Sequence, residues 1–210
     1  MEKQITIHAA LAEIKKLKQR IEKGTRNAVF IGNMKKSADT VNGYAYTKQE
    51  FKTIVEANYK SLNDLIKNLN EYKSKVTLSN ALTTLVVGKE TMTVAEAIFR
   101  KEYIEYEKTL LRKMKTQYEN VVSNTTMKNE KVENDLNDQV TVLVGKDTKA
   151  KDNLLSFMEQ YRNTNSWENV DPLELKVIID ELEDRIFDFE TNVDAALSVS
   201  NATTTITIEV

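Results

Sequence analysis

The chain of 210 residues contains no cysteine, one proline and five glycines. The lack of cysteine excludes disulfide bridges and thiolate metal sites, and it fits a reducing compartment such as the cytoplasm. With so few helix-breaking residues, a composition rich in Lys, Glu, Leu and Ala favours long helices. No run of about eighteen apolar residues is present, so we expect no membrane-spanning helix. The first residues also lack the apolar core of a signal peptide, and we expect the protein to stay where it is made.

Charge is distributed unevenly, although the net charge is only −2. Residues 1–36 hold nine Lys or Arg against three Glu, whereas residues 167–210 hold two Lys or Arg against eleven Asp or Glu. A basic segment is typical of nucleic-acid binding, but so acidic a C-terminal part would repel a phosphate backbone. We therefore expect no nucleic-acid partner. Instead, we expect the first and last helices to be neighbours, within one chain or between the subunits of a homo-oligomer.

Apolar residues at helical spacing predict helices near residues 6–23, 47–78, 93–144, 149–161 and 171–199. The pairs Thr47 with Glu50 and Thr93 with Glu96 have the spacing of capping boxes, in which each side chain bonds a free backbone N–H of the other. Residues 123–129 weaken the pattern of the long segment, which is either one helix or two joined helices. Residues 145–147 end that run, and Asp171 before a proline marks the start of the last helix.

Two similar phrases, SNALTTLVVG at residues 79–88 and SNATTTITIEV at residues 200–210, each follow a helix and change to the composition of a strand. Asn80 and Asn201 are expected to end the helices in the left-handed conformation. We expect the two strands to pair with each other or with the apolar residues 27–31. The predicted fold is mainly α, with long antiparallel helices in a coiled-coil-like bundle and a small β-sheet of short strands after helices.

We expect one helical domain over residues 1–210, with two departures from a simple bundle. Residues 24–46 form a long basic loop or β-hairpin insertion, with candidate strands at 27–31 and 41–46. Residues 123–165 form a helical insertion. A loop as long as the first is uncommon in a compact chain unless it has a function or is mobile.

Five segments together are similar to those of a known group of proteins. They are ALAEIKKLKQRIE at 10–22, LIKNLNEYKSKVTLSNALTTL at 65–85, TVAEAIFRKEYIEYEKTLLRKM at 93–114, DPLELKVIIDELEDRI at 171–186 and the final SNATTTI. In this order they resemble the septicolysin-like family of helical proteins from bacteria and their phages over roughly two thirds of the chain, and the Lys-, Asn- and Thr-rich style is most similar to a Bacillus-phage version. The resemblance implies a helical fold and oligomers, but no established activity. The insertions at 24–46 and 123–165 depart from the family pattern.

Candidate ligand-binding residues concentrate in the basic loop. Lysine and arginine side chains can hold phosphates, and tyrosine rings can stack on a base. The residues of this type are Arg26, Lys35, Lys36, Tyr44 and Tyr46. A solvated loop without a ligand is the alternative. The segment GNMKKS at 32–37 lacks the spacing of a P-loop.

Four further candidates lie on helices. Arg20 and Arg100 occur beside apolar positions, where a guanidinium needs carboxylates or an anionic ligand. Salt bridges to an acidic residue of the last helix, Asp180 or Glu183, are the favoured interpretation. Asn80 and Asn201 complete the candidate set, because they carry the resemblance and close the two phrases.

Catalytic patterns are scarce. His8 is the single histidine and supplies no triad or metal site alone. The acids of residues 180–184 point around a helix and are expected to form a solvated or salt-bridged face. We expect no metal, no cofactor and no enzymatic activity. The leading hypothesis is an oligomeric phage protein that sequesters a phosphate-bearing ligand such as a nucleotide immune signal. The alternatives are a structural protein of a phage particle and a hydrolase that uses carboxylates.

Overall fold

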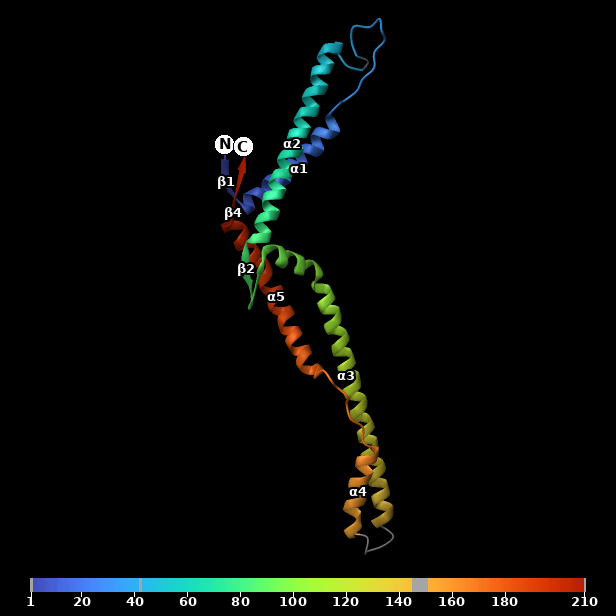
Figure 1. Ribbon diagram of the computed structural model, residues 1–210. Helices are drawn as coiled ribbons and strands as arrows, with labels where there is room; N and C mark the ends of the chain where they lie inside the picture. The colour runs from blue at the N-terminus through green and yellow to red at the C-terminus, as the bar shows by residue number, and fades with distance from the viewer. Residues whose placement is uncertain (1, 42, 145–150, 210) are drawn as a thin grey trace. The chain divides into compact units, whose positions relative to one another are not determined.

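The computed structural model describes residues 2–41, 43–144 and 151–209, and the described part of the chain is mainly helical. The mainly α class with short strands after helices, predicted above, is confirmed. In chain order the elements are β1 (Glu2–Thr6), α1 (Ile7–Asn27), α2 (Lys48–Leu82), β2 (Thr84–Val87), β3 (Glu90–Thr93), α3 (Val94–Val144), α4 (Lys151–Asn165), α5 (Leu175–Thr203) and β4 (Thr205–Glu209) (Figure 1).

The chain divides into two compact units. One contains the residues up to 102 together with those from 188 onward, and the other contains residues 103–187. The first unit holds the packed pair α1 and α2, all four strands, the start of α3 and the end of α5. The single domain expected for residues 1–210 stays a prediction. Within the described ranges, no helix combines the length and the apolar character needed to cross a membrane.

The first unit contains two corners in which a helix passes into one strand of an antiparallel pair. In the hairpin corner (residues 79–97), α2 leads into β2, which pairs with β3. The chain then continues from β3 into α3. In the terminal corner (residues 2–10 and 200–209), α5 leads into β4, which pairs with β1 at the start of α1. The two ends of the chain therefore lie side by side (Figure 1).

The two corners have the same local geometry. The backbone N–H of Thr83 donates to Ser79 O at 2.8 Å, and that of Thr204 donates to Ser200 O at 2.9 Å. The carbonyl of Thr83 accepts the N–H of Val94, the first residue of α3, at 2.9 Å. The carbonyl of Thr204 accepts the N–H of Ile7, the first residue of α1, also at 2.9 Å. The two phrases noticed in the sequence thus build the same helix ending twice.

The same correspondence extends to the helix that leaves each corner. The hydroxyl of Thr6 accepts the N–H of Ala9 at 3.2 Å, and the hydroxyl of Thr93 accepts the N–H of Glu96 at 3.1 Å. These two threonines also occupy equivalent pairing positions, Thr6 opposite Thr205 and Thr93 opposite Thr84. The chain therefore contains two β-α-α-β arrangements in tandem, β1-α1-α2-β2 and β3-α3-α5-β4, of which the second also contains α4.

Alternate residues of the strands are buried in both corners. In the terminal corner, Ile206 and Ile208 pack in one apolar cluster with residues of α1 and α2, namely Ile7, Ala10, Ile14 and Val76. In the hairpin corner the equivalent strand residues Leu85 and Val87 are buried, as are Val94 and Ala97 of α3. A strand with one buried face has its register set by this alternation, because a slip by one residue would expose every apolar side chain.

Several predicted boundaries and pairings are wrong. The two phrase strands do not pair with each other or with residues 27–31. Instead, β2 pairs with β3 and β4 pairs with β1, because these strands lie nearest to them and take one edge of each. Asn80 and Asn201 remain helical and have no positive φ, since the helices continue to Leu82 and Thr203 and end through a threonine N–H. The first helix likewise continues past Gly24 to Asn27.

The long loop forms no hairpin of strands. Over residues 28–41 and 43–47 the described backbone is irregular and contains one isolated bridge, between Thr40 and Thr47. An isolated strand pair is weak, and the loop has no further strand to support it. By contrast, residues 123–129 do not interrupt α3, which is one continuous helix. The predicted stop at 145–147 lies outside the described residues.

Candidate functional site

The nine predicted binding residues do not converge on one site. Arg20 is exposed on α1, whereas Asn80 and Asn201 lie in the last turns of α2 and α5, half-buried. The loop candidates lie at the other end of α1, which has 21 residues and is therefore about 30 Å long. The loop and the strand corners are thus separate places in the first unit (Figure 1).

The loop between α1 and α2 encloses a pocket of about 670 Å³, within the range of small-molecule sites. Its walls include Asn33, Lys35, Thr40 and Tyr44. The chain turns sharply here, since Gly43 has a φ of 80° and the N–H of Tyr44 donates to Val41 O at 3.0 Å. Of the predicted residues, this pocket brings Lys35 and Tyr44 together.

An apolar anchor holds the loop against α2. Val41 is buried, and the ring of Tyr44 lies 5.4 Å from that of Phe51 on α2. Gly32 fits closely against this anchor, because a Cβ atom there would lie 2.6 Å from Val41 Cγ1 and 2.9 Å from Phe51 Cζ. The pocket wall is therefore fixed by packing at residues on either side of the turn.

A second hollow of about 480 Å³ shares part of this loop. It is lined by Asn33 and Met34 from the loop and by Lys48 and Lys52 from the first turns of α2. The sequence interpretation missed both lysines and Asn33. The capping box at Thr47 was the available signal, since it places the next residue at the start of a helix and beside the loop.

Positive charge surrounds the two hollows. Residues 26–48 contain Arg26, Lys35, Lys36 and Lys48 against the single acid Asp39. These four side chains are exposed, and within the described ranges none of them forms an ion pair. These four cations are therefore not neutralised by described protein groups and remain accessible to an anion.

Glu50 is close by but already engaged. Its carboxylate accepts the backbone N–H of Thr47 at 2.8 Å and the hydroxyl of Thr47 at 2.8 Å. These hydrogen bonds, that of the backbone first, hold the pKa of Glu50 below its usual value. The carboxylate therefore stays ionised and caps α2, and it occupies the N–H that an anionic ligand would otherwise use.

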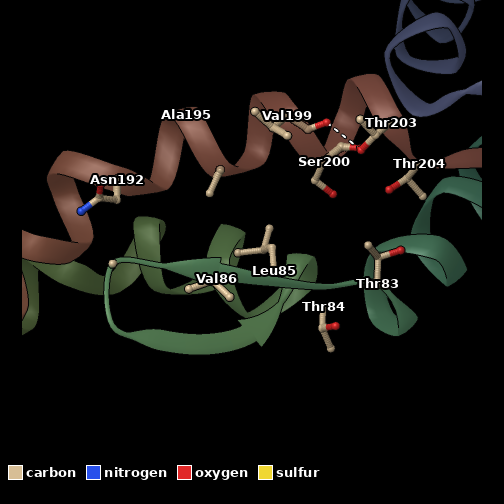
Figure 2. A pocket seen from close by; sticks show the side chains of 12 residues that line it. Thr83, Thr84, Leu85, Val86, Asn192, Ala195, Val199, Ser200, Thr203 and Thr204 are labelled. Atoms are coloured by element: carbon tan, nitrogen blue, oxygen red, sulfur yellow. Dashed lines mark hydrogen bonds between the residues drawn. The ribbon is translucent and has the colours of Figure 1, made fainter.

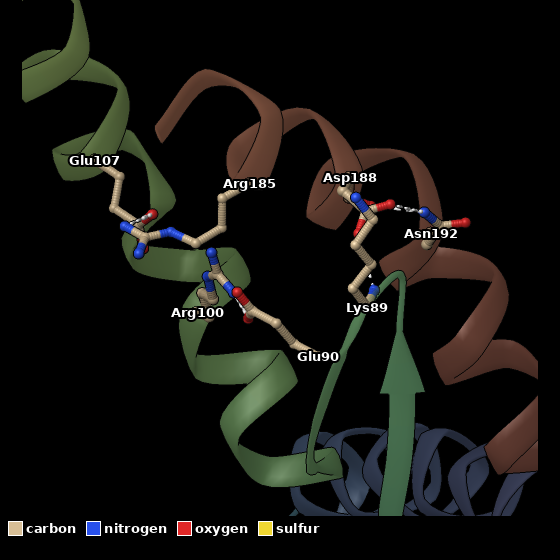
Figure 3. Close-up of polar contacts among 7 residues, drawn as sticks. All are labelled: Lys89, Glu90, Arg100, Glu107, Arg185, Asp188 and Asn192. Carbon is tan, nitrogen blue, oxygen red and sulfur yellow. Dashed lines mark hydrogen bonds and ion pairs between the residues drawn. The ribbon is translucent and has the colours of Figure 1, made fainter. Parts of the chain in front are cut away.

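Arg100 belongs to the hairpin corner and is internally paired. Its guanidinium bonds the carboxylate of Glu90 (Figure 3). It also lies over the ring of Phe189, 4.5 Å from the centroid. The predicted partners were different, and both are engaged elsewhere: Asp180 pairs with Lys176 at 2.6 Å and Glu183 with Lys115 at 2.5 Å.

The uneven charge of the two ends has only a partial structural counterpart. The N–H of Ile7 at the start of α1 donates to Thr204 O just after α5, but among the described residues no ion pair joins a basic residue of α1 to an acid of α5. In the described part of the chain, the exposed cations of α1 without an ion pair are Lys15, Lys18, Arg20, Lys23 and Arg26. The salt bridge predicted for Arg20 is therefore absent, and its guanidinium faces solvent.

Few described groups are arranged for acid–base or metal chemistry. His8 is exposed on α1, and in residues 2–41, 43–144 and 151–209 no three His, Cys, Asp or Glu side chains are grouped to hold a metal ion. The loop hollows instead combine ammonium groups, amides, a hydroxyl and a phenol. Such a set can hold and orient a polar anionic molecule.

Comparison with models of known protein families, with curated proteins and with solved structures finds no match to this chain. The resemblance to the septicolysin-like family stays a prediction.

Proposed function

We propose that this protein binds a small phosphate-bearing ligand, of the nucleotide class, at the loop between α1 and α2 and holds it without transforming it. The observation that carries the proposal is the pocket of about 670 Å³ whose wall includes both Lys35 and Tyr44. Lys35 supplies a cation for a phosphate, and Tyr44 supplies an aromatic ring or a phenol for the remainder of the ligand.

The surroundings of the pocket support an anionic ligand. Arg26, Lys36 and Lys48 extend the positive field along the loop, and a field of one sign draws anions toward a site. The hollow beside Lys48 offers room for a second phosphate or for a longer ligand. In a phage-encoded protein, such a site fits sequestration of a nucleotide signal of the host.

Calorimetry against mononucleotides, dinucleotides and cyclic nucleotides tests the proposal. Lys35→Ala should weaken binding at least tenfold, because a hydrogen bond to a charged group contributes about 1.5–3 kcal/mol. Lys60→Ala is the matched control, since Lys60 is an exposed lysine of α2 without an ion pair among the described residues and away from both hollows.

Three further results bear on the proposal. Binding should weaken as salt rises, and the ligand recovered after denaturing the complex should be chemically unchanged. A changed ligand would favour the hydrolase alternative. Absence of binding across the panel, or equal losses in Lys35→Ala and Lys60→Ala, would contradict the loop site.

A second candidate function is that of an assembly protein built from copies of this chain. Its specific support is the second unit, where large apolar side chains are exposed on the helices: Tyr106, Leu110, Val121, Met127, Leu155 and Phe187. The exposed cations of α1 and the acids of α5 are complementary in charge, which suits contacts between subunits.

Light scattering over a salt series separates this candidate from a monomeric binder. Assembly through the charged helices should weaken at high salt, because screening reduces the attraction between exposed charges. A mass equal to one chain at low salt, or an oligomer whose mass does not depend on salt, would contradict this account of the contact.

A further inference from the structure

A groove runs between α5 and β2 in the hairpin corner, away from the loop site. Its volume is about 550 Å³, and 12 residues line it (Figure 2). Asn192, Ala196, Val199 and Thr203 come from α5, and Thr84 and Val86 are among those from β2. In Figure 2 the side chain of Leu85 points toward α5, whereas that of Thr84 points away from the helix.

The strand wall of the groove has free backbone groups. In a hairpin with a two-residue turn, the residue pair next to the turn is hydrogen-bonded. Pairs without and with hydrogen bonds then alternate along the two strands. The backbone groups of Val87 and Leu85 therefore hydrogen-bond to β3. The hydrogen bond from the N–H of Val94 to Thr83 O fits the same alternation. The N–H and C=O groups of Thr84 and Val86 consequently point away from β3, toward the edge of β2 beside which the described residues form no further strand.

The equivalent edge in the terminal corner faces a helix that reaches it. There the N–H of Glu209 points outward from β4, and it donates to Glu71 Oε1 of α2 at 2.9 Å. Asn192 occupies the position of Glu71 in the hairpin corner, but its amide donates to the backbone carbonyl of Asp188 at 2.8 Å within α5. In each corner a helix thus bonds the far end of the strand, through Glu71 at Glu209 in one corner and through Asp188 at Lys89 in the other.

The helix facing the groove also has smaller side chains than its counterpart. Ala196 and Thr203 of α5 stand where α2 has Lys75 and Leu82, four residues before and three residues after the equivalent serine of each phrase. These two residues of α5, which line the groove, are therefore smaller than their sequence counterparts in α2.

The turn beside the groove is held in place by α5. Asp188 accepts the N–H of Lys89 at 2.9 Å (Figure 3). Gly88 approaches so closely that a Cβ atom there would lie 1.9 Å from Asp188 Oδ2. The turn at this end of the groove is therefore bonded to α5 and packs closely against it.

The lining is uncharged, although charged residues make up 30% of the chain. It combines threonine and serine hydroxyls with alanine and valine. Interface centres are depleted of charge, and an extended peptide added to a sheet edge takes its affinity from main-chain hydrogen bonds. A charged occupant would lose hydration in this groove without gaining a partner.

We propose that this groove binds an extended, uncharged peptide segment of a partner protein, which pairs with the free edge of β2 as a third strand. The peptide backbone bonds Thr84 and Val86, and its inward side chains are small or β-branched, to fit against Ala196 and Val199. The site is distinct from the loop pocket, so failure of either leaves the other untouched.

The experiment uses the full chain and a blocked peptide, acetyl-Thr-Val-Thr-Val-Thr-amide. Its affinity is measured by fluorescence anisotropy, and its position by amide chemical shifts of residues 84–87. Saturable binding is expected, with shifts at Thr84 and Val86. The same peptide methylated at alternate backbone nitrogens should bind at least tenfold more weakly, because it cannot donate to the strand edge.

Ala196→Lys is the blocking variant, since the terminal corner has lysine at this position. It should reduce peptide affinity at least tenfold and leave the far-ultraviolet circular dichroism unchanged. Ser198→Lys is the matched control, because it adds the same charge to α5 at an exposed residue outside the lining. Thr203→Leu tests the groove without adding charge, and the same loss of affinity is expected.

Three outcomes would overturn the proposal. The first is no saturable binding up to about 1 mM peptide. The second is equal affinity for the plain and the methylated peptide. The third is a concentration-dependent protection of the Thr84 and Val86 amides in the protein alone, removed by Ala196→Lys, because this result would assign the groove to a second copy of the chain.

Discussion

The terminal strand β4 should contribute strongly to stability through Ile208. Its side chain is 2% exposed and packs in the cluster with Ile7, Ala10 and Val76. Truncating a buried isoleucine to alanine removes transfer free energy and leaves a cavity, which together cost about 2–5 kcal/mol. Because Ile208 is almost fully buried in a cluster that joins the two ends of the chain to α2, we expect a loss of about 3 kcal/mol for Ile208→Ala.

Urea unfolding of Ile208→Ala, followed by circular dichroism, measures this loss as a change in midpoint at constant slope. Thr207→Ala is the control. It changes the neighbouring residue on the exposed face of the same strand and should alter stability by no more than about 0.5 kcal/mol. The comparison separates the packing of one side chain from any general disturbance of the chain end.

The equivalent substitution in the other corner extends the test. Val87 is also 2% exposed and is one of the alternate buried residues of β2. Val87→Ala removes fewer atoms and should cost about 2 kcal/mol. A loss below about 1 kcal/mol for Ile208→Ala, or similar losses for Ile208→Ala and Thr207→Ala, would refute the register and the packing described for β4.

Three further perturbations test the capping and the turn. Thr93→Ala removes the hydroxyl that accepts the Glu96 N–H and should lower the free energy of unfolding by about 1 kcal/mol, measured in urea. The pKa of Glu50 is lowered by hydrogen bonds from Thr47, so its contribution to stability is present above the unfolded pKa of about 4.3 and is lost as pH falls through the lower folded value. Glu50→Gln should therefore flatten the acid limb of the stability profile, and an unchanged limb would contradict the cap. Asp188→Ala releases the N–H of Lys89, so hydrogen exchange at that amide should accelerate while exchange at β4 stays constant.

The helices could be predicted because their signals are local. The capping boxes at Thr47 and Thr93 place both carboxylates three residues away along the chain, and each forms the expected bonds in the structure. The apolar spacing along α2 and α3 similarly reports a face within each helix. The weak stretch at residues 123–129 was ambiguous, because helix propensity is a small quantity and the neighbouring turns outweigh it.

Half of the candidate site could be foreseen for a similar reason. Lys35 and Tyr44 lie in one short loop, so a local basic and aromatic pattern was enough to group them. Lys48 was missed because its position beside the loop depends on the direction in which α2 begins. Arg20 was wrongly included as a paired residue, since its exposure depends on which face of α1 packs on α2.

The strands show most clearly which features depend on the local sequence and which depend on the tertiary structure. Local composition in SNALTTLVV and SNATTTITI was sufficient to predict that a strand follows each helix, because strand propensity depends on neighbours along the chain. Pairing partners could not be read in this way. β1 is a short, partly charged segment with no strand signal, and it pairs with β4 across almost the whole length of the chain. That choice depends on the packing of Ile206 and Ile208 against α1 and α2, which exists only when distant segments meet. The open groove beside β2 depends in turn on which side chains of α5 face that strand, and therefore also on the folded arrangement.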